Sequence, residues 1–328
     1  MDAFLFHVRR FAGWILGVVG GVLSFLSSWD LVEDAKFDQT TLSIMANTFI
    51  YITVILLLIF VITLYYNSSR KEKYANITTS IHNINHHIRD LNNYLIENRP
   101  SDDASIQEYN SYLSQSKTYI SHILDFSADI FRSLTSTNCR TSIKLTYENN
   151  GELYFYTYAR DSASAGRYRD RDRKRVRDNH DPLNKNKRFA QLFSSDESHW
   201  HYFSNNLSKD SEFQTTSMTA YKPELTTGLN SHRKRFSMFN WPLPYRSTIS
   251  CVIRQGSCNL MEERDSEVLG FLTVDSESRG VFIEKWDTQI VFAVADAIFT
   301  PLKQVIKIQA IVNSMQNQDK KNGIPSPT

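Results

Sequence analysis

Two long uncharged runs lie near the start of the sequence. The first spans Phe11–Trp29 and the second Leu42–Tyr66, and the second contains the solid apolar stretch ITVILLLIFVITLYY. A helix needs about 20 apolar residues to cross the hydrocarbon core of a bilayer. The pattern predicts a hairpin of two transmembrane helices within residues 1–69. A cleaved signal peptide is the alternative interpretation of the first run, but no small-residue cleavage site follows it.

Charges beside the two runs predict their orientation. Arg9 and Arg10 precede the first run, Arg70, Lys71 and Lys73 follow the second, and the connecting loop is mostly acidic. Because positively charged flanks stay on the cytoplasmic side, both termini are expected in the cytoplasm. The expected location is an inner or plasma membrane, with the chain crossing it more than once.

A stripe of small residues lies within the first run. Gly13, Gly17 and Gly21 recur every four residues, so one side of the predicted helix lets another backbone approach closely. Two interpretations stay open: packing of the two membrane helices within one chain, and a self-association face.

An apolar seam follows the second run, with spacings that alternate between three and four residues. This is the a/d pattern of a coiled coil, and it predicts a linker helix over residues 70–100. The pattern favours a homo-oligomer, with packing against the next helix of the same chain as the alternative. His82 and His86 lie on this helix, but no Cys, Asp or Glu completes a metal site nearby, so no metal is expected. The seam consists of Tyr74, Ile77, Ile81, Ile84, Ile88, Leu91 and Leu95.

The remainder of the chain changes from helical periodicity to alternation and back. Residues 101–136 carry an apolar helical stripe that begins after an N-cap signal at Ser101-Asp102-Asp103. Alternating runs then flank Asn149-Asn150-Gly151, which predicts a hairpin. Two more strands are expected at 247–254 and 268–275, and a long helix at 286–312. A polar, disordered tail is expected at 313–328.

The closing part of this pattern resembles a known family. STISCVIR, a loop, VLGFLTVDSESRGVFIEKWD and a long helix are similar to the closing half of GAF domains, with Gly270 in the strand and Phe282 in the short loop. The resemblance implies an antiparallel sheet with helices on one side and loops over a ligand cavity on the other. The expected fold class is therefore α+β, with a GAF-like sensor domain over residues 101–312.

Strand ends that face loops supply the candidate ligand-binding residues, because ligand groups cluster at such positions. Arg160 and Asp161 end the first hairpin, Arg254 ends the next strand, and Asp275 and Ser276 end the last one. The two arginines carry forked donors that suit a phosphate or carboxylate. The alternative is that Arg160 and Asp161 pair with neighbours across the sheet.

An arginine-rich stretch lies between the two hairpins. Such a run can bind an anionic small molecule or a lipid headgroup, and a solvated loop of Arg–Asp pairs is the alternative. The net charge of +2 is close to balanced and indicates no class of binding partner for the whole chain. Nucleic acid is not expected as a partner. The candidate residues are Arg167, Arg169, Arg171, Arg173, Lys174, Arg175 and Arg177.

Enzyme signatures are missing from the sequence: it has no Gly-rich phosphate loop, no G-x-S-x-G and no H-E-x-x-H. Three cysteines give no disulfide framework. The interpretation is a non-enzymatic, cofactor-free sensor that binds a small molecule or protein partner and signals through its membrane helices. Its layout is analogous to that of bacterial membrane-disrupting defence effectors. A membrane-tethered scaffold and an unrecognised nucleotide or lipid enzyme are the alternatives.

Overall fold

The computed structural model describes residues 39–164, 180–194, 200–216, 241, 243–254 and 267–321, together with Gly17, Gly21 and Ser24. The chain divides into two compact units, Met1–Lys71 and Glu72–Thr328. This division lies beside the expected boundary at residues 69/70. The larger unit includes nearly all of the expected linker helix as well as the expected sensor domain.

The second uncharged run lies within helix α3, Gln39–Glu97. Between Ile50 and Tyr65 this helix is apolar, and the large side chains that it exposes are 41–77% accessible. The first predicted membrane helix lies outside the described residues, apart from Gly17, Gly21 and Ser24.

Within the described part of the chain, one helix is both long and apolar enough to span a bilayer, and it is Glu284–Gln318. Half of its apolar window is buried inside the protein. Its apolar residues include Ile298 and Leu302, which are fully buried in the core of the larger unit. The composition of this helix is therefore explained by its packing in that core.

The larger unit is built on a six-stranded antiparallel sheet with the order β3-β2-β1-β6-β5-β4. The predicted hairpin is confirmed: β1 and β2 pair around Asn150 and Gly151, which both have positive φ angles. The two later predicted strands, β5 and β6, are confirmed as well. The strands are β1 Cys139–Asn149, β2 Glu152–Arg160, β3 Asp181–Pro182, β4 His201–Ser204, β5 Ser247–Arg254 and β6 Val268–Ser276.

Helix α4, Ile106–Thr135, begins later than the sequence predicts. Its N-cap is Ser105, whose hydroxyl accepts from the backbone N–H of Glu108, while the Glu108 carboxylate accepts from the backbone N–H of Ser105. This reciprocal capping box satisfies two backbone donors, which the earlier Ser101-Asp102-Asp103 sequence does not do for this helix.

Helix α9, Glu284–Lys321, is longer than predicted. The tail expected to be disordered from residue 313 continues as helix to Lys321, and residues 322–328 lie outside the described part. Polar residues such as Asn, Gln and Lys do not stop a helix that is already formed, because only Gly and Pro strongly oppose it. Gly323 and Pro325 come after the described end.

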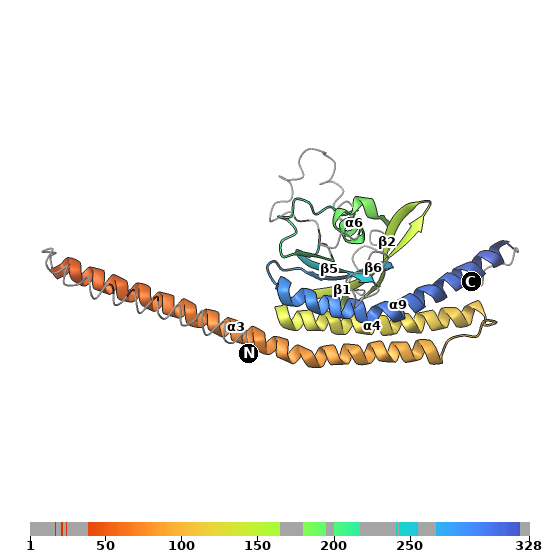
Figure 1. The fold of residues 1–328 in the computed structure, drawn as a ribbon, viewed down its shortest axis with the longest axis horizontal. Helices are drawn as coiled ribbons and strands as arrows, with labels where there is room; N and C mark the ends of the chain where they lie inside the picture. The colour runs from red at the N-terminus through yellow and green to blue at the C-terminus, as the bar shows by residue number, and fades with distance from the viewer. Residues whose placement is uncertain are drawn as a thin grey trace, which may run out of the picture. The chain divides into compact units, whose positions relative to one another are not determined.

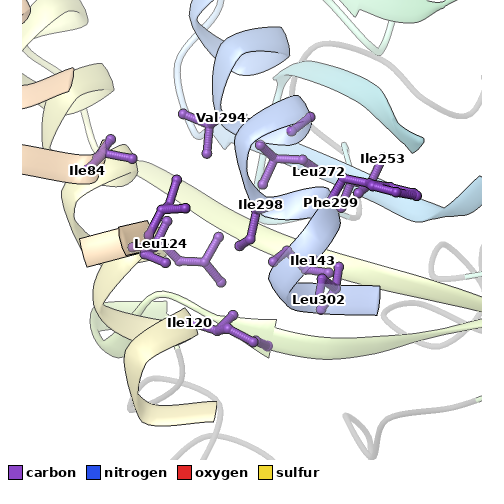
Figure 2. Close-up of a cluster of buried hydrophobic side chains, with 14 of the residues drawn as sticks. Ile84, Ile120, Leu124, Ile143, Ile253, Leu272, Val294, Ile298, Phe299 and Leu302 are labelled. Atoms are coloured by element: carbon purple, nitrogen blue, oxygen red, sulfur yellow. The ribbon is translucent and has the colours of Figure 1, made fainter. Parts of the chain in front are cut away.

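Three layers make up the larger unit (Figure 1). The sheet packs on α4 and α9, and residues 72–97 of α3 form an outer layer beside α4. Figure 2 shows side chains of all three layers meeting in one core, among them Ile84 of α3, Leu124 of α4, Ile143 of β1 and Ile298 of α9. The structure thus confirms the α+β class and the antiparallel sheet with helices on one side that the GAF resemblance implied.

The apolar seam of α3 faces this core. Ile77, Ile84, Ile88, Leu91 and Leu95 are at most 6% exposed in the single chain, and Ile81 is partly buried against the same cluster. Contacts with α4 run alongside the seam: the Tyr112 hydroxyl donates to the Leu95 carbonyl oxygen (2.8 Å), and the His87 ring stacks on Phe126 (4.7 Å between centroids). Packing within the chain therefore occupies the seam, and self-association through it stays a prediction.

Candidate functional site

The sheet has one apolar face and one polar face. On β1, Ile143 and Leu145 point into the core with the helices. Because side chains alternate along a strand, Arg140, Ser142 and Lys144 lie on the opposite side. We call this side the outer face of the sheet.

The strand register places further polar residues on the outer face. Directly opposed residues in an antiparallel pair point to the same side of the sheet. Arg140 of β1 is opposite Asp275 of β6, and Asp275 is opposite Thr248 of β5. One row across three neighbouring strands therefore carries a guanidinium group, a carboxylate and a hydroxyl group.

A second row lies beside the first. Arg160 of β2 is opposite Ser142 of β1, Ser142 is opposite Thr273 of β6, and Thr273 is opposite Ser250 of β5. The last three are at most 6% exposed. Polar side chains in the middle of a sheet are costly to bury unless they are hydrogen-bonded, so this row needs a structural or a functional explanation.

Hydrogen bonds hold these rows in place. The Thr248 hydroxyl donates to Asp275 Oδ1 (2.6 Å), and the Ser142 and Thr273 hydroxyls lie 2.7 Å apart. Arg160 Nη2 donates to the Thr157 hydroxyl on its own strand (3.2 Å). The hydroxyl groups are thus largely satisfied within the sheet, and the charged groups remain as the chemically distinctive part of the face.

Three cationic side chains gather around Asp275. Arg140, Lys144 and Arg160, which we call the basic cluster, all act on the Asp275 carboxylate. Glu277, whose side chain is half exposed, lies 3.9 Å from Arg140. Such a gathering of forked and point-charge donors has the chemistry that binds an anion.

The pKa of Asp275 is raised above its ordinary value. Burial is the main cause, since it disfavours the charged carboxylate. The Thr248 hydrogen bond and the basic cluster act in the opposite direction but do not cancel the effect of burial. A carboxyl with a raised pKa beside cations is a feature often found at binding sites.

Aromatic packing covers the neighbouring part of the outer face. Helix α6, Lys187–Phe193, places Phe189 4.9 Å from Phe271 and 5.0 Å from Phe155, as ring centroid distances. The Lys144 ammonium lies 5.4 Å from the Phe155 ring centroid. The basic cluster therefore lies beside an apolar cluster that restricts access from this side.

The structure separates Arg254 from the other predicted ligand residues. The Arg254 guanidinium lies 3.6 Å from the Trp200 ring centroid, and a register shift beside it leaves Leu269 of β6 without a partner on β5. The guanidinium also lowers the pKa of Asp296 on α9, which burial raises. Arg160 is three strands away, about 14 Å across the sheet and about 13 Å along it. The structure thus does not bring the two arginines together, and ligand binding by either of them stays a prediction.

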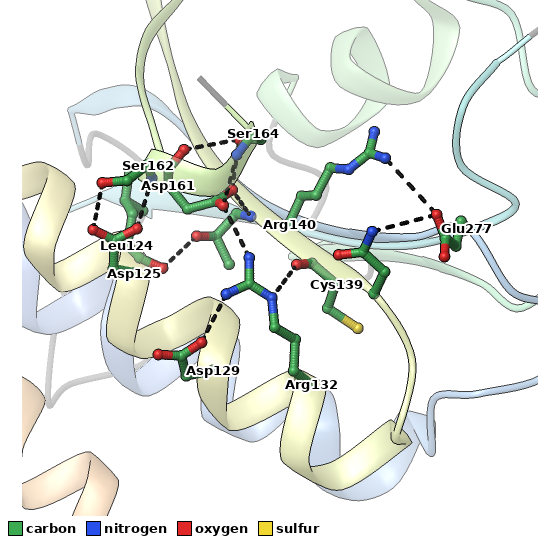
Figure 3. A network of polar contacts seen from close by, with 12 residues as sticks. Leu124, Asp125, Asp129, Arg132, Cys139, Arg140, Asp161, Ser162, Ser164 and Glu277 are labelled. Carbon is green, nitrogen blue, oxygen red and sulfur yellow. Dashed lines mark hydrogen bonds and ion pairs between the residues drawn. The ribbon is translucent and has the colours of Figure 1, made fainter. Parts of the chain in front are cut away.

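Asp161 and Ser276 serve the fold instead of lining the outer face. Asp161 is fully buried and accepts from Arg132 Nη2 and from the backbone N–H groups of Thr141 and Ser164, each at 3.0 Å. Figure 3 shows this network, which joins α4 to the end of the first hairpin. The Ser276 hydroxyl is also fully buried and lies 2.9 Å from that of Thr137. Arg160 and Asp275 are thus the predicted residues that the outer face brings together.

Several predicted residues lie outside the described part of the chain. These are Gly13 and the whole arginine-rich set at 167–177. Gly17 and Gly21 are described, and a Cβ built on either has no described atom within 4 Å. Their proposed role in self-association stays a prediction.

Two of the three cysteines are described, and both are buried. Burial raises the pKa of the Cys139 thiol and raises that of Cys251 further. Since the thiolate is the nucleophilic form, neither thiol is suited to nucleophilic chemistry. Cys258 lies outside the described residues.

Sequence reasoning missed Arg140, Ser142, Lys144, Thr248 and Thr273. The signal was present, because RTSIK and STIS alternate polar and apolar residues within strands. Arg140 and Thr248 lie near the beginnings of β1 and β5, and the other three lie inside their strands, whereas the predicted ligand residues lie at the closing ends of strands.

No protein-family model matches the sequence, and comparison with curated proteins finds no relative. Among solved structures, the chain is similar to the GAF domain from a phosphoenolpyruvate-protein phosphotransferase of Coxiella burnetii (9% identity, 64% of this chain and 99% of that chain, TM-score 0.36). A putative GAF sensor protein from Burkholderia vietnamiensis is also similar (11%, 62% and 99%, 0.33). So is free methionine-R-sulfoxide reductase from Neisseria meningitidis in complex with its substrate (9%, 63% and 95%, 0.33).

Proposed function

We propose that this chain is a membrane-anchored sensor whose GAF-like domain binds an anionic small molecule on the outer face of its sheet. The observation that carries the proposal is the basic cluster of Arg140, Lys144 and Arg160 around Asp275. The two central strands, β1 and β6, supply three of these four residues. An anionic ligand would be an electrostatic partner that all three cations can share.

Carboxylate and phosphate ligands share the chemistry that this cluster recognises. Arginine offers a planar fork of donors to either group, and lysine offers a point charge. The proposal is of a binding protein, not an enzyme.

Thermal unfolding of the full chain in mild detergent tests the binding proposal. Sulfate, pyrophosphate or citrate at a hundredfold excess over Kd should raise Tm by about 5–10 °C. Arg160→Met keeps the aliphatic part of the side chain but removes the charge, so the shift should largely disappear. Arg89→Met is the matched control, since Arg89 is exposed on α3 beside Asp90, and it should keep the full shift. Equal shifts in both variants would show only a general salt effect.

Membrane anchoring is the second part of the proposal. It is supported by the exposed apolar side chains between Ile50 and Tyr65, which the described protein does not cover. The Thr48 and Thr63 hydroxyls donate to backbone carbonyls one turn earlier, those of Ile44 and Ile59. Hydroxyl groups satisfied within their own helix suit a surrounding that offers no water. The proposal includes a hairpin of two membrane helices with both termini in the cytoplasm. It also includes a response to ligand binding in which the membrane segment acts as a defence effector.

Alkaline carbonate extraction tests the anchoring. The wild-type chain should remain in the membrane pellet. Leu57→Arg combined with Ile59→Arg should weaken retention, because each arginine at the centre of a span costs about 2.5–3.5 kcal/mol on insertion scales. Ile96→Arg is the control: Ile96 is 70% exposed on the larger unit, and this variant should be retained like the wild type. Release of the wild-type chain into the supernatant would refute the anchoring.

A further inference from the structure

The outer face holds a carboxylate at the position where an anion would bind. Asp275 lies between Arg140 and Thr248 in the register, and it accepts a hydrogen bond from the Thr248 hydroxyl at 2.6 Å. A bound anion that uses the basic cluster would therefore place a second negative charge beside this carboxylate. Two negative charges brought side by side repel each other, so the anion and the charged carboxylate destabilise one another.

The charged groups around Asp275 come from each neighbouring strand. Arg140 and Lys144 lie on β1 and Arg160 lies on β2, and all three favour the charged form of Asp275. On the β5 side, the uncharged Thr248 hydroxyl donates a hydrogen bond to the carboxylate. Glu277 follows two residues after Asp275 and lies 3.9 Å from Arg140. Each cation that turns toward an anion gives less support to the charged carboxylate.

We infer that Asp275 takes up a proton when the anion binds, so that the site binds its ligand more tightly as the pH falls. This inference rests on the proposed function and adds a regulation to the same site. Protonation removes the repulsion between carboxylate and ligand and leaves the three cations to the ligand. The protonated carboxyl can also donate a hydrogen bond to an oxygen of the anion.

The direction of the effect follows from linkage. Burial already raises the pKa of Asp275 in the free protein, and a neighbouring anion raises it further. Between the pKa of the free site and that of the occupied site, binding takes up one proton. The affinity then falls about tenfold for each unit of rising pH. Above both pKa values the carboxylate stays charged and the affinity reaches its lower limit.

The same shift has a consequence for folding. A carboxyl whose pKa is higher in the folded protein than in the unfolded chain binds its proton more tightly when folded. Its contribution to stability is therefore complete below the unfolded pKa and is lost as the pH rises through the folded pKa. Asp275→Asn should thus not destabilise the protein at neutral pH, because the amide oxygen can still accept from Thr248.

Isothermal titration calorimetry with sodium sulfate tests the inference on the full chain in detergent. Sulfate keeps its charge between about pH 5 and pH 8, so any proton taken up comes from the protein. Titrations in two buffers of different ionisation enthalpy should show uptake of up to about one proton for the wild type. Asp275→Asn should bind sulfate more tightly than the wild type at about pH 8 and lose this uptake. Asp129→Asn, a change on exposed α4 surface, should keep it.

The possible outcomes separate the two proposals. Sulfate binding by the wild type without proton uptake overturns the role of Asp275 and leaves the anion site intact. Uptake that persists in Asp275→Asn assigns the proton to another group and also overturns it. A wild-type chain that binds neither sulfate, pyrophosphate nor citrate overturns the proposed function and this inference together.

Discussion

Asp161→Ala should lower the free energy of unfolding by about 3–5 kcal/mol, because it removes one partner of a buried ion pair. The Arg132 guanidinium would lose the acceptor at 3.0 Å, and the backbone N–H groups of Thr141 and Ser164 would lose theirs. Each buried donor left without an acceptor adds to the cost. The change would loosen α4 from the end of the first hairpin, which also carries Arg160. Urea-induced unfolding in detergent, followed by near-ultraviolet circular dichroism, measures the effect.

Asp129→Ala is the matched control for this prediction. Asp129 accepts from Nη1 of the same arginine at 2.7 Å, but its side chain is 64% exposed. Exposed ion pairs contribute about 0–1 kcal/mol, so the control should differ little from the wild type. Equal losses in the two variants would mean that burial does not decide the strength of this network.

Gly270→Ala should cost at least about 3 kcal/mol, since it forces atoms together in the middle of the sheet. Gly270 lies on β6 between Leu145 of β1 and Ile253 of β5. A Cβ at this position would overlap the carbonyl oxygen of Lys144 and lie 2.9 Å from the Leu145 Cα. These are backbone atoms of a paired strand, so they cannot move aside as a flexible side chain would. The register that aligns the basic cluster would be disturbed with them.

Gly151→Ala provides the comparison at a turn. Its φ is +78°, but a Cβ there has no described atom within 4 Å. The cost should be about 1–2 kcal/mol, which is the price of a positive φ for an alanine. A Gly270→Ala protein as stable as Gly151→Ala would contradict the close approach of β1 and β6. Thermal unfolding of both variants under identical conditions decides this.

The elements with strong local signals were predictable from the sequence. Asn149-Asn150-Gly151 fixes the first hairpin because few other residues adopt positive φ at both turn positions. The apolar stripe of α9 predicts a core helix, but it does not fix the end of the helix, because the polar residues after 312 suit both an exposed helix and a disordered tail. The true N-cap of α4 needed the Ser105–Glu108 pair, and Ser101-Asp102-Asp103 gave a competing signal.

The candidate site was predictable in part, and the reason is geometric. Arg160 and Asp275 were predictable because they lie at the closing ends of strands, whereas Arg140 lies at the beginning of β1. The order β2-β1-β6-β5 decides which strands are neighbours on the outer face. The sequence of a single strand does not contain this information. The stacking of Arg254 on Trp200 was not readable from the sequence either, because it joins segments that are 54 residues apart. Likewise, an a/d seam has the same spacing whether a second chain or α4 covers it.

A crystal structure of the protein with pyrophosphate would show where the anion binds. We expect density on the outer face, with phosphate oxygens within hydrogen-bonding distance of at least two of Arg140, Lys144 and Arg160. An anion bound instead between Arg254 and Trp200, or on the helix side of the sheet, would contradict the proposed site.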